Sequence, residues 1–158
     1  VPDAVIIGSM KQALVAPEQA SGGILDGVVR TVPQAEGLVA VLAEIGRPLD
    51  HLLLFNVDEE ELVARLSART VCDACQAPFM GRAAGEGHDG CPKSPPGHLV
   101  RRKDDEPDAV RNRLRVYEAQ TAPVIDWFRA HGQPIDAVDA VGTLDAVTQR
   151  MLAAVGRA

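Results

Sequence analysis

The sequence lacks the features that mark membrane proteins and general nucleic-acid-binding proteins. No apolar run in the chain approaches the ~20 residues that cross a bilayer. The net charge of −6 and the pI near 5.1 leave no basic excess for a nucleic-acid backbone. With 158 residues, of which 46% are apolar and 24% charged, the composition is that of one globular domain. We therefore expect neither a membrane nor a nucleic acid as a partner.

Lysine is scarce, and the usual lysine-containing phosphate loop is absent. The three lysines are Lys11, Lys93 and Lys103, and none follows a strand in a glycine-rich loop. The motif G-x₄-G-K-[S/T], which cradles nucleotide phosphates, does not occur. Arginines instead gather at both ends of the segment from Arg69 to Arg113. Because arginine stays charged and its planar fork matches phosphate oxygens, this segment suits a flap that covers a polyanion.

Cysteine is limited to Cys72, Cys75 and Cys91, too few and too clustered for a secreted disulfide framework. Such clustering favours a metal site in a reducing compartment. The spacing is that of a zinc knuckle, but a fourth cysteine would fall at Ser94, and a hydroxyl is a poor zinc ligand. His88 precedes Cys91 by three residues and completes a possible Cys₃His site. The alternative is a metal-free loop in which the cysteines are small apolar residues.

Hydrophobic periodicity predicts helices and short strands in alternation. Strands are expected at Ile24–Asp26, 51–57 and 135–139, and the second of these should be fully buried. Helices are expected at Val5–Leu14, after Thr31, after Asp58, from Glu106 and after Thr143. The helix after Asp58 should begin with a capping box that includes Glu61. The helix from Glu106 should be kinked at Pro123. This order predicts an α/β fold, a parallel sheet flanked by helices.

The stretch from Cys72 to Leu99 has little periodicity and many turn residues, which is typical of an inserted loop or small knuckle domain. We therefore divide the chain into a core part at 1–69, a lid at 70–101 and a second core part at 102–158. The chain begins at Val1 without a methionine or a first strand, and we expect it to be truncated at the N-terminus.

Two groups of polar residues suit anion binding. Gly27 to Arg30 lies between a predicted strand and a predicted helix, where free N–H groups and Arg30 suit a phosphate. Asp26 at the strand end suits a hydrated Mg²⁺. An ordinary βα turn is the alternative. Arg65 and Arg69, four residues apart on the helix expected after Asp58, would repel each other without an anion between them.

Three separated segments resemble the adenylate kinases. Gly23 to Gln34 is similar to the strand–turn–helix of that family, except that Val28-Val29 replaces the usual Phe-Pro. The helix from Val57 to Arg69 resembles the one that leads into the family's lid. Leu99 to Asp105 and Arg111 to Pro123 resemble the segment that leaves it. The resemblance extends over almost the whole chain and implies a P-loop-kinase-like fold with an inserted lid.

The resemblance also implies roles for individual residues. The implied AMP contacts are Val1, Gly27, Val28, Val29, Arg30, Gln34, Arg102 and Arg113. The implied ATP contacts are Arg65, Arg69, Pro78, Phe79 and Gly142. Arg30, Arg69, Arg102 and Arg113 would act on the transferred phosphate, with Asp104 and Asp105 orienting the arginines.

The implied activity is reversible phosphoryl transfer, ATP + AMP ⇌ 2 ADP, with Mg²⁺ bound to ATP, in a cytoplasmic monomer. In this family the P-loop lies upstream of the position matching Val1, so we expect the chain as printed to be inactive alone. One alternative is another nucleoside monophosphate kinase, whose acceptor base the contacts near Val1 and Gln34 would choose. Another is a non-catalytic zinc-ribbon module that binds nucleotides.

Overall fold

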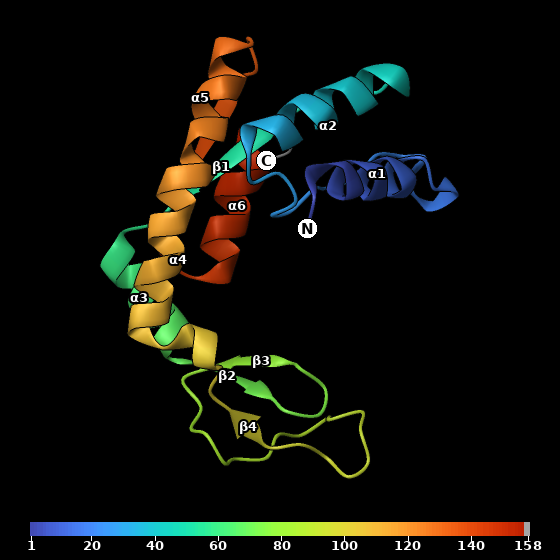
Figure 1. Ribbon diagram of the computed structural model, residues 1–158. Coiled ribbons are helices and arrows are strands. Elements are labelled where there is room, and N and C mark those ends of the chain that lie inside the picture. Colours follow the sequence, from blue (N-terminus) through green and yellow to red (C-terminus); the bar gives the residue numbers. More distant parts are fainter. Residues whose placement is uncertain (157–158) are drawn as a thin grey trace. The chain divides into compact units, whose positions relative to one another are not determined.

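The computed structural model describes residues 1–156, which fold into two compact units. The first unit contains Val1–Asn56 and the chain from Val116 onward, and the second contains Val57–Arg115. Figure 1 shows the elements of both. Among the described helices, none is both long enough and apolar enough to span a bilayer.

Two helices form one core of the first unit. Helix α1 (Asp3–Leu14) packs on α2 (Val32–Glu44), with the short 3₁₀ turn η1 (Pro17–Gln19) between them. The buried side chains of this core are Met10, Leu14, Leu38, Val41 and Leu42. The helices approach so closely that a Cβ at Gly37 would collide with the Ile7 side chain. As predicted, α2 follows Thr31 and ends before Gly46, whose φ is +68°.

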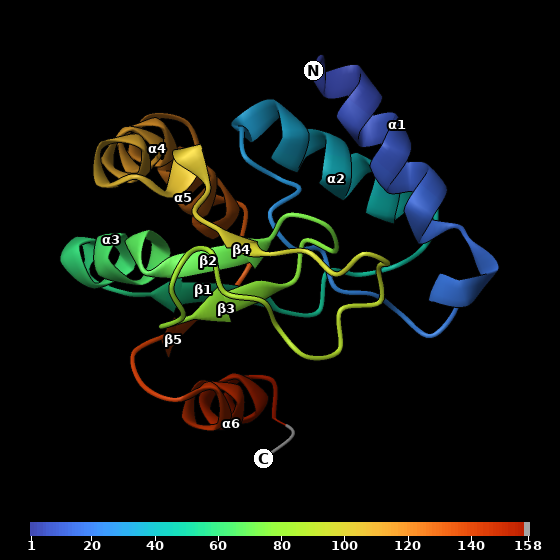
Figure 2. The ribbon, with the colours of Figure 1, turned by 90° about the horizontal axis from the view of Figure 1, so that it is seen from below.

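A parallel pair of strands forms the sheet of the first unit. Strand β1 (Leu52–Asn56) pairs with β5 (Ile135–Asp139), with Leu52 opposite Ile135 and Asn56 opposite Asp139. Helices α5 (Ala122–Ala130) and α6 (Leu144–Ala154) both contact β5 (Figure 2). The predicted α/β class with a parallel sheet is therefore confirmed.

Ala35, Val124 and Phe128 form a second buried cluster in this unit. The long predicted helix is divided into α4 (Pro107–Gln120) and α5, with Thr121 between them, so the break at Pro123 is confirmed. Thr143 caps α6 as expected, because its hydroxyl accepts the Ala146 N–H at 3.3 Å.

Two expectations for the first unit are wrong. Ile24–Asp26 is not a strand, and Ile24 is 94% exposed. A short apolar run becomes a strand only when a neighbour supplies a hydrogen-bonded ladder, and no described strand pairs with this run. The 51–57 segment does contain β1, but it is not fully buried, since Phe55 is 46% exposed.

The second unit contains a small antiparallel sheet. Helix α3 (Glu59–Ser67) leads into β2 (Arg69–Cys72), which pairs with β3 (Pro78–Met80) on one side and β4 (Leu99–Val100) on the other. The 3₁₀ turn η2 (Lys103–Asp105) and the first part of α4 follow. Val63, Val71, Cys72, Leu99 and Val110 are buried. The aperiodic stretch is therefore organised around β2.

Candidate functional site

In the first unit, the turn before α2 is stabilised by side-chain hydrogen bonds to its backbone. Gly27 has φ +61°, which favours glycine, and its carbonyl accepts a 2.7 Å hydrogen bond from Arg30 Nε. The Thr121 hydroxyl donates to the Arg30 carbonyl at 3.1 Å. The Arg30 guanidinium is thus bonded through Nε to the turn itself, and one of its terminal nitrogens lies 3.6 Å from where a Cβ of Gly27 would stand.

Gln34 links this turn to α1. Its Oε1 accepts the Arg30 backbone N–H at 2.7 Å, and its Nε2 donates to Asp3 Oδ1 at 2.8 Å. Gln34 is only 5% exposed. Gln34, which the resemblance assigns to AMP, is therefore nearly buried, and both the oxygen and the nitrogen of its amide are hydrogen-bonded.

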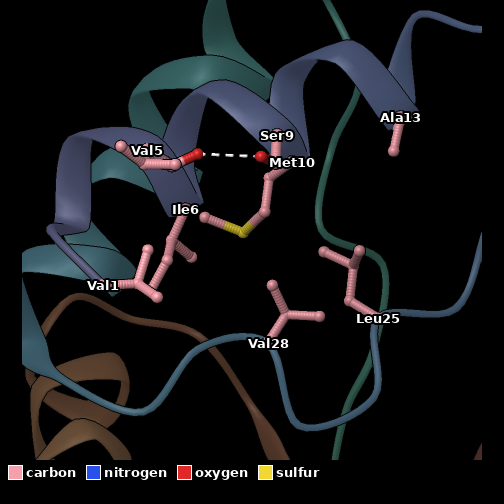
Figure 3. A pocket seen from close by; sticks show the side chains of 8 residues that line it. All are labelled: Val1, Val5, Ile6, Ser9, Met10, Ala13, Leu25 and Val28. Carbon is pink, nitrogen blue, oxygen red and sulfur yellow. Dashed lines mark hydrogen bonds between the residues drawn. The ribbon is translucent and has the colours of Figure 1, made fainter.

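Beside α1 lies an apolar pocket of about 320 Å³. Figure 3 shows its lining residues, which come from the N-terminus, α1 and the loop before α2: Val1, Val5, Ile6, Ser9, Met10, Ala13, Leu25 and Val28. The only side-chain hydroxyl in this set, on Ser9, donates to the Val5 carbonyl at 2.9 Å. The pocket thus offers an apolar surface that suits a flat ring.

Other predicted residues of the first unit are not among those that line this pocket. Asp26 is exposed and does not end a strand, because the expected strand is absent. Val29 packs against both buried clusters of the unit, so its side chain stabilises the turn from inside. Gly142, with φ +119°, lies in a loop that Arg150 Nη1 holds by donating to the carbonyls of Asp139 and Val141 at 2.8 and 2.6 Å.

In the second unit, arginines from three parts of the chain meet two aspartates. Asp105 is wholly buried, and its carboxylate accepts two hydrogen bonds from Arg69, at 2.8 Å from Nε and 2.6 Å from Nη2. Arg113 Nη1 lies 3.8 Å from the same carboxylate and donates to the Asp104 carbonyl at 3.4 Å. Arg102 makes two hydrogen bonds to the Asp104 carboxylate, at 2.9 and 2.7 Å. We call these five residues the arginine–aspartate cluster.

The charges of this cluster do not cancel, because three guanidinium groups face two carboxylates. Hydrogen bonding to Asp105 raises the pKa of Arg69, and hydrogen bonding to Asp104 raises that of Arg102. The bonds from Arg102 lower the pKa of Asp104. All three arginines keep N–H donors beyond those that the carboxylates accept, as a site for phosphate oxygens requires.

The expectation for Arg65 and Arg69 as helix neighbours is wrong. Helix α3 ends at Ser67, and Arg69 is the first residue of β2, opposite Met80. Arg65 Nε instead bonds Glu61 Oε1 at 2.7 Å, one turn earlier. Because Glu61 is engaged there and Asp58 makes no side-chain cap, the predicted capping box is also wrong.

The four candidate metal ligands lie together. One ligand atom from each of Cys72, Cys75, His88 and Cys91 falls within 4.8 Å of the other three. Sγ of Cys72 and Cys91 are 3.9 Å apart, and Cys75 Sγ is 3.5 Å from His88 Nε2. Around a tetrahedral zinc ion the expected S–S separation is about 3.8 Å and the S–N separation about 3.6 Å, given bonds of about 2.3 and 2.05 Å. The four residues therefore fit zinc.

The electrostatics around this metal cluster favour thiolates at Cys72 and Cys91. The pKa of Cys75 is raised, because the bond from the Ala77 backbone N–H is outweighed by burial and by hydrogen bonds to the other two thiols. The Cys75 backbone N–H, 3.5 Å from Cys72 Sγ, is the largest influence on the Cys72 thiol, and its pKa falls to about 6. The Gly97 backbone N–H lowers the pKa of Cys91. Thiolates are the form that binds metal. Phe79, an expected ATP contact, stacks at a tilt on His88 with ring centroids 4.7 Å apart, while Pro78 beside it is exposed.

The structure also shows partners that the sequence did not predict. Asp3 precedes Gln34 by 31 residues, and Arg150 follows Asp139 by 11, so no short motif signals either contact. Arg30 belongs to the first unit and the arginine–aspartate cluster to the second. The convergence of all four arginines on one pair of nucleotides stays a prediction.

Comparison with known proteins agrees with the residues described above. A model of the adenylate kinase family matches residues 1–133. An adenylate kinase of Gemmatimonas aurantiaca is 59% identical over 155 residues, which make up 98% of this chain and 71% of that protein. One from Citrifermentans bemidjiense is 41% identical over 98% of this chain and 72% of its own length. One from Lysinibacillus sphaericus is 43% identical over 84% of this chain and 61% of its own length.

Proposed function

The chain belongs to the adenylate kinase family, and we propose that it serves the reversible transfer of a phosphoryl group from ATP to AMP, giving two ADP. In the forward direction an AMP phosphate oxygen bonds to the γ-phosphorus while the bond from that phosphorus to the oxygen of the leaving ADP breaks. Such a reaction depends mainly on positioning and on neutralising the charge of the phosphates. ATP enters as its Mg²⁺ complex, and we assign Asp26 to the hydration shell of that ion.

The observation that carries this proposal is the arginine–aspartate cluster. Buried Asp105 holds Arg69 by two hydrogen bonds, so the guanidinium is oriented before any ligand arrives. We assign Arg69, Arg102 and Arg113 to the phosphates between the two nucleotides. Asp104 and Asp105 are already engaged by arginines, which suits them to positioning rather than to accepting a proton. Preorganised positive charge of this kind stabilises the charge of the transferred group.

The first unit supplies the monophosphate side in this proposal. Gly27, Val28, Val29 and Arg30 would hold AMP through the turn, and the Arg30 guanidinium suits its phosphate. Val1 and Val28 line the apolar pocket, which suits the base. Gln34 would contact the base through its amide.

We assign the ATP side to Arg65, Arg69, Pro78, Phe79 and Gly142. Residues 70–101 would act as a lid over the phosphates, in which a zinc ion held by Cys72, Cys75, His88 and Cys91 joins the two ends of the loop. The ion would be structural, because all four ligand positions are filled by protein atoms. We further propose that the protein is a cytoplasmic monomer. Sedimentation at several protein concentrations tests the monomeric state.

The acceptor assay tests the function. With the gene product that contains these residues, phosphate transfer from MgATP to AMP, CMP, UMP and GMP should show the largest kcat/KM for AMP. A pyrimidine preference would identify another nucleoside monophosphate kinase. Nucleotide binding without turnover in that same product would favour the non-catalytic zinc-ribbon module.

A further inference from the structure

The Gln34 amide is held in one orientation by two partners that cannot exchange roles. A carboxylate only accepts hydrogen bonds, and a backbone N–H only donates one. Asp3 therefore requires Nε2 on its side, 2.8 Å away, and the Arg30 N–H requires Oε1 on the other, 2.7 Å away. If the amide turned over, two acceptors would meet at Asp3 and two donors at Arg30.

This orientation matters because the two kinds of purine present opposite patterns at C6. Adenine carries an amino donor there beside an acceptor nitrogen, whereas guanine and hypoxanthine carry a carbonyl acceptor beside an N–H donor. An amide has a second N–H and a second lone pair left after the bonds described above. In one orientation these complement adenine, and in the other they complement a 6-oxopurine.

We propose that Asp3 is a positioning residue that fixes the Gln34 amide and thereby favours adenine over 6-oxopurines at the monophosphate site. The inference rests on the proposed function, in which Gln34 contacts the acceptor base. Gln34 is nearly buried, so a base reaches the amide only as Asp3 and Arg30 present it. Asp3 itself lies in the first turn of α1, two residues after Val1, which lines the apolar pocket.

The decisive variant is Asp3→Asn. Asparagine has the same shape and still bonds Gln34, but its own amide can present either an acceptor to Nε2 or a donor to Oε1. Residue 3 then accepts either orientation of the Gln34 amide. The ratio of kcat/KM for AMP to that for IMP should fall about tenfold, the effect of roughly one hydrogen bond to a charged group. A gain with IMP should account for most of the change.

Three controls separate this role from a structural one. Glu36→Gln removes an exposed carboxylate from α2, two residues from Gln34, and should leave the AMP/IMP ratio unchanged. Asp3→Glu keeps an acceptor-only group and should retain most of the ratio. In a Gln34→Ala background, Asp3→Asn should have no further effect on the ratio, because the group it orients is gone.

The outcomes distinguish this inference from the proposed function. A wild-type protein without preference for AMP would overturn both. A wild-type preference that Asp3→Asn leaves intact would overturn the role of Asp3 alone. If Asp3→Asn does not fold, NMR detection of coupling across the hydrogen bond from Gln34 Nε2 to the Asp3 carboxylate decides the matter in the wild-type protein, and its absence would refute the inference.

Discussion

The second unit contains two clusters of polar side chains that differ in what they need from outside the protein. In the arginine–aspartate cluster, donors and acceptors meet each other directly, and the buried carboxylate of Asp105 is fully engaged by Arg69. In the metal cluster, three sulfurs and a ring nitrogen lie within 4.8 Å of one another. The first is organised before a ligand binds, whereas we propose that the second is stabilised by an ion.

The largest expected effect comes from breaking the metal cluster. Replacing Cys75 by Ser substitutes a poor ligand for a thiolate. Zinc content should fall from near one per chain, and the second unit should lose much of its resistance to thermal unfolding, because in such sites the metal-binding energy is also folding energy. Elemental analysis and calorimetry measure the two effects.

The matched control for this experiment is Ser94→Ala, at the place where a fourth cysteine would fall by spacing. It should change neither zinc content nor thermal stability, because in the proposed site His88 is the fourth ligand. Purified wild-type protein without bound metal would refute the zinc site. Loss of zinc in the Ser94 variant would refute the role of His88.

Removing the buried carboxylate should have the next largest effect. Asp105→Asn keeps the shape of the side chain but leaves Arg69 without its anionic partner. Breaking a buried ion pair in this way costs roughly 3 kcal/mol of unfolding free energy. Denaturant unfolding measures the loss, and phosphate transfer should fall as well, because Arg69 is no longer oriented.

Asp104→Asn is the control for Asp105, because it removes an equal charge at the adjacent position. Asp104 is half-exposed and engages Arg102 in solvent. Its replacement should therefore cost much less stability. Equal losses in the two variants would show that burial of Asp105 does not set the strength of this cluster.

The two clusters also differ in how far the sequence could predict them. Spacing alone pointed to Cys72, Cys75, His88 and Cys91, because metal ligands must meet at one point and lie close together along the chain. The hydrogen bonds between Arg69 and Asp105 span 36 residues, and no local pattern encodes them. Only the resemblance to a family suggested that these arginines and aspartates act together.

In the fold, too, local features could be predicted from the sequence and features that depend on distant partners could not. Periodicity and apolar runs predicted α1, α2, β1, β5 and α6, because the apolar residues that mark these elements lie within the element itself. They failed at Ile24–Asp26, because strand formation depends on a partner elsewhere in the chain. They also placed Arg69 on a helix, since pairing of β2 with β3 ends the helical segment at a point that helix propensity does not mark.

The smallest expected effect is a change in the pKa of the Asp104 carboxyl, which titration measures. Hydrogen bonds from Arg102 lower the pKa of Asp104 below its usual value. Their stabilising effect is therefore fully present above about pH 4, the ordinary aspartate pKa. It is lost as the pH falls through the lower pKa of the folded protein. NMR titration of the Asp104 carboxyl carbon should show a midpoint that rises toward the ordinary value in Arg102→Leu. The difference in stability between wild type and this variant should vanish in acid. An unchanged midpoint would mean that the exposed pair is not formed in solution, and that within the arginine–aspartate cluster only Asp105 orients arginines, namely Arg69 and Arg113.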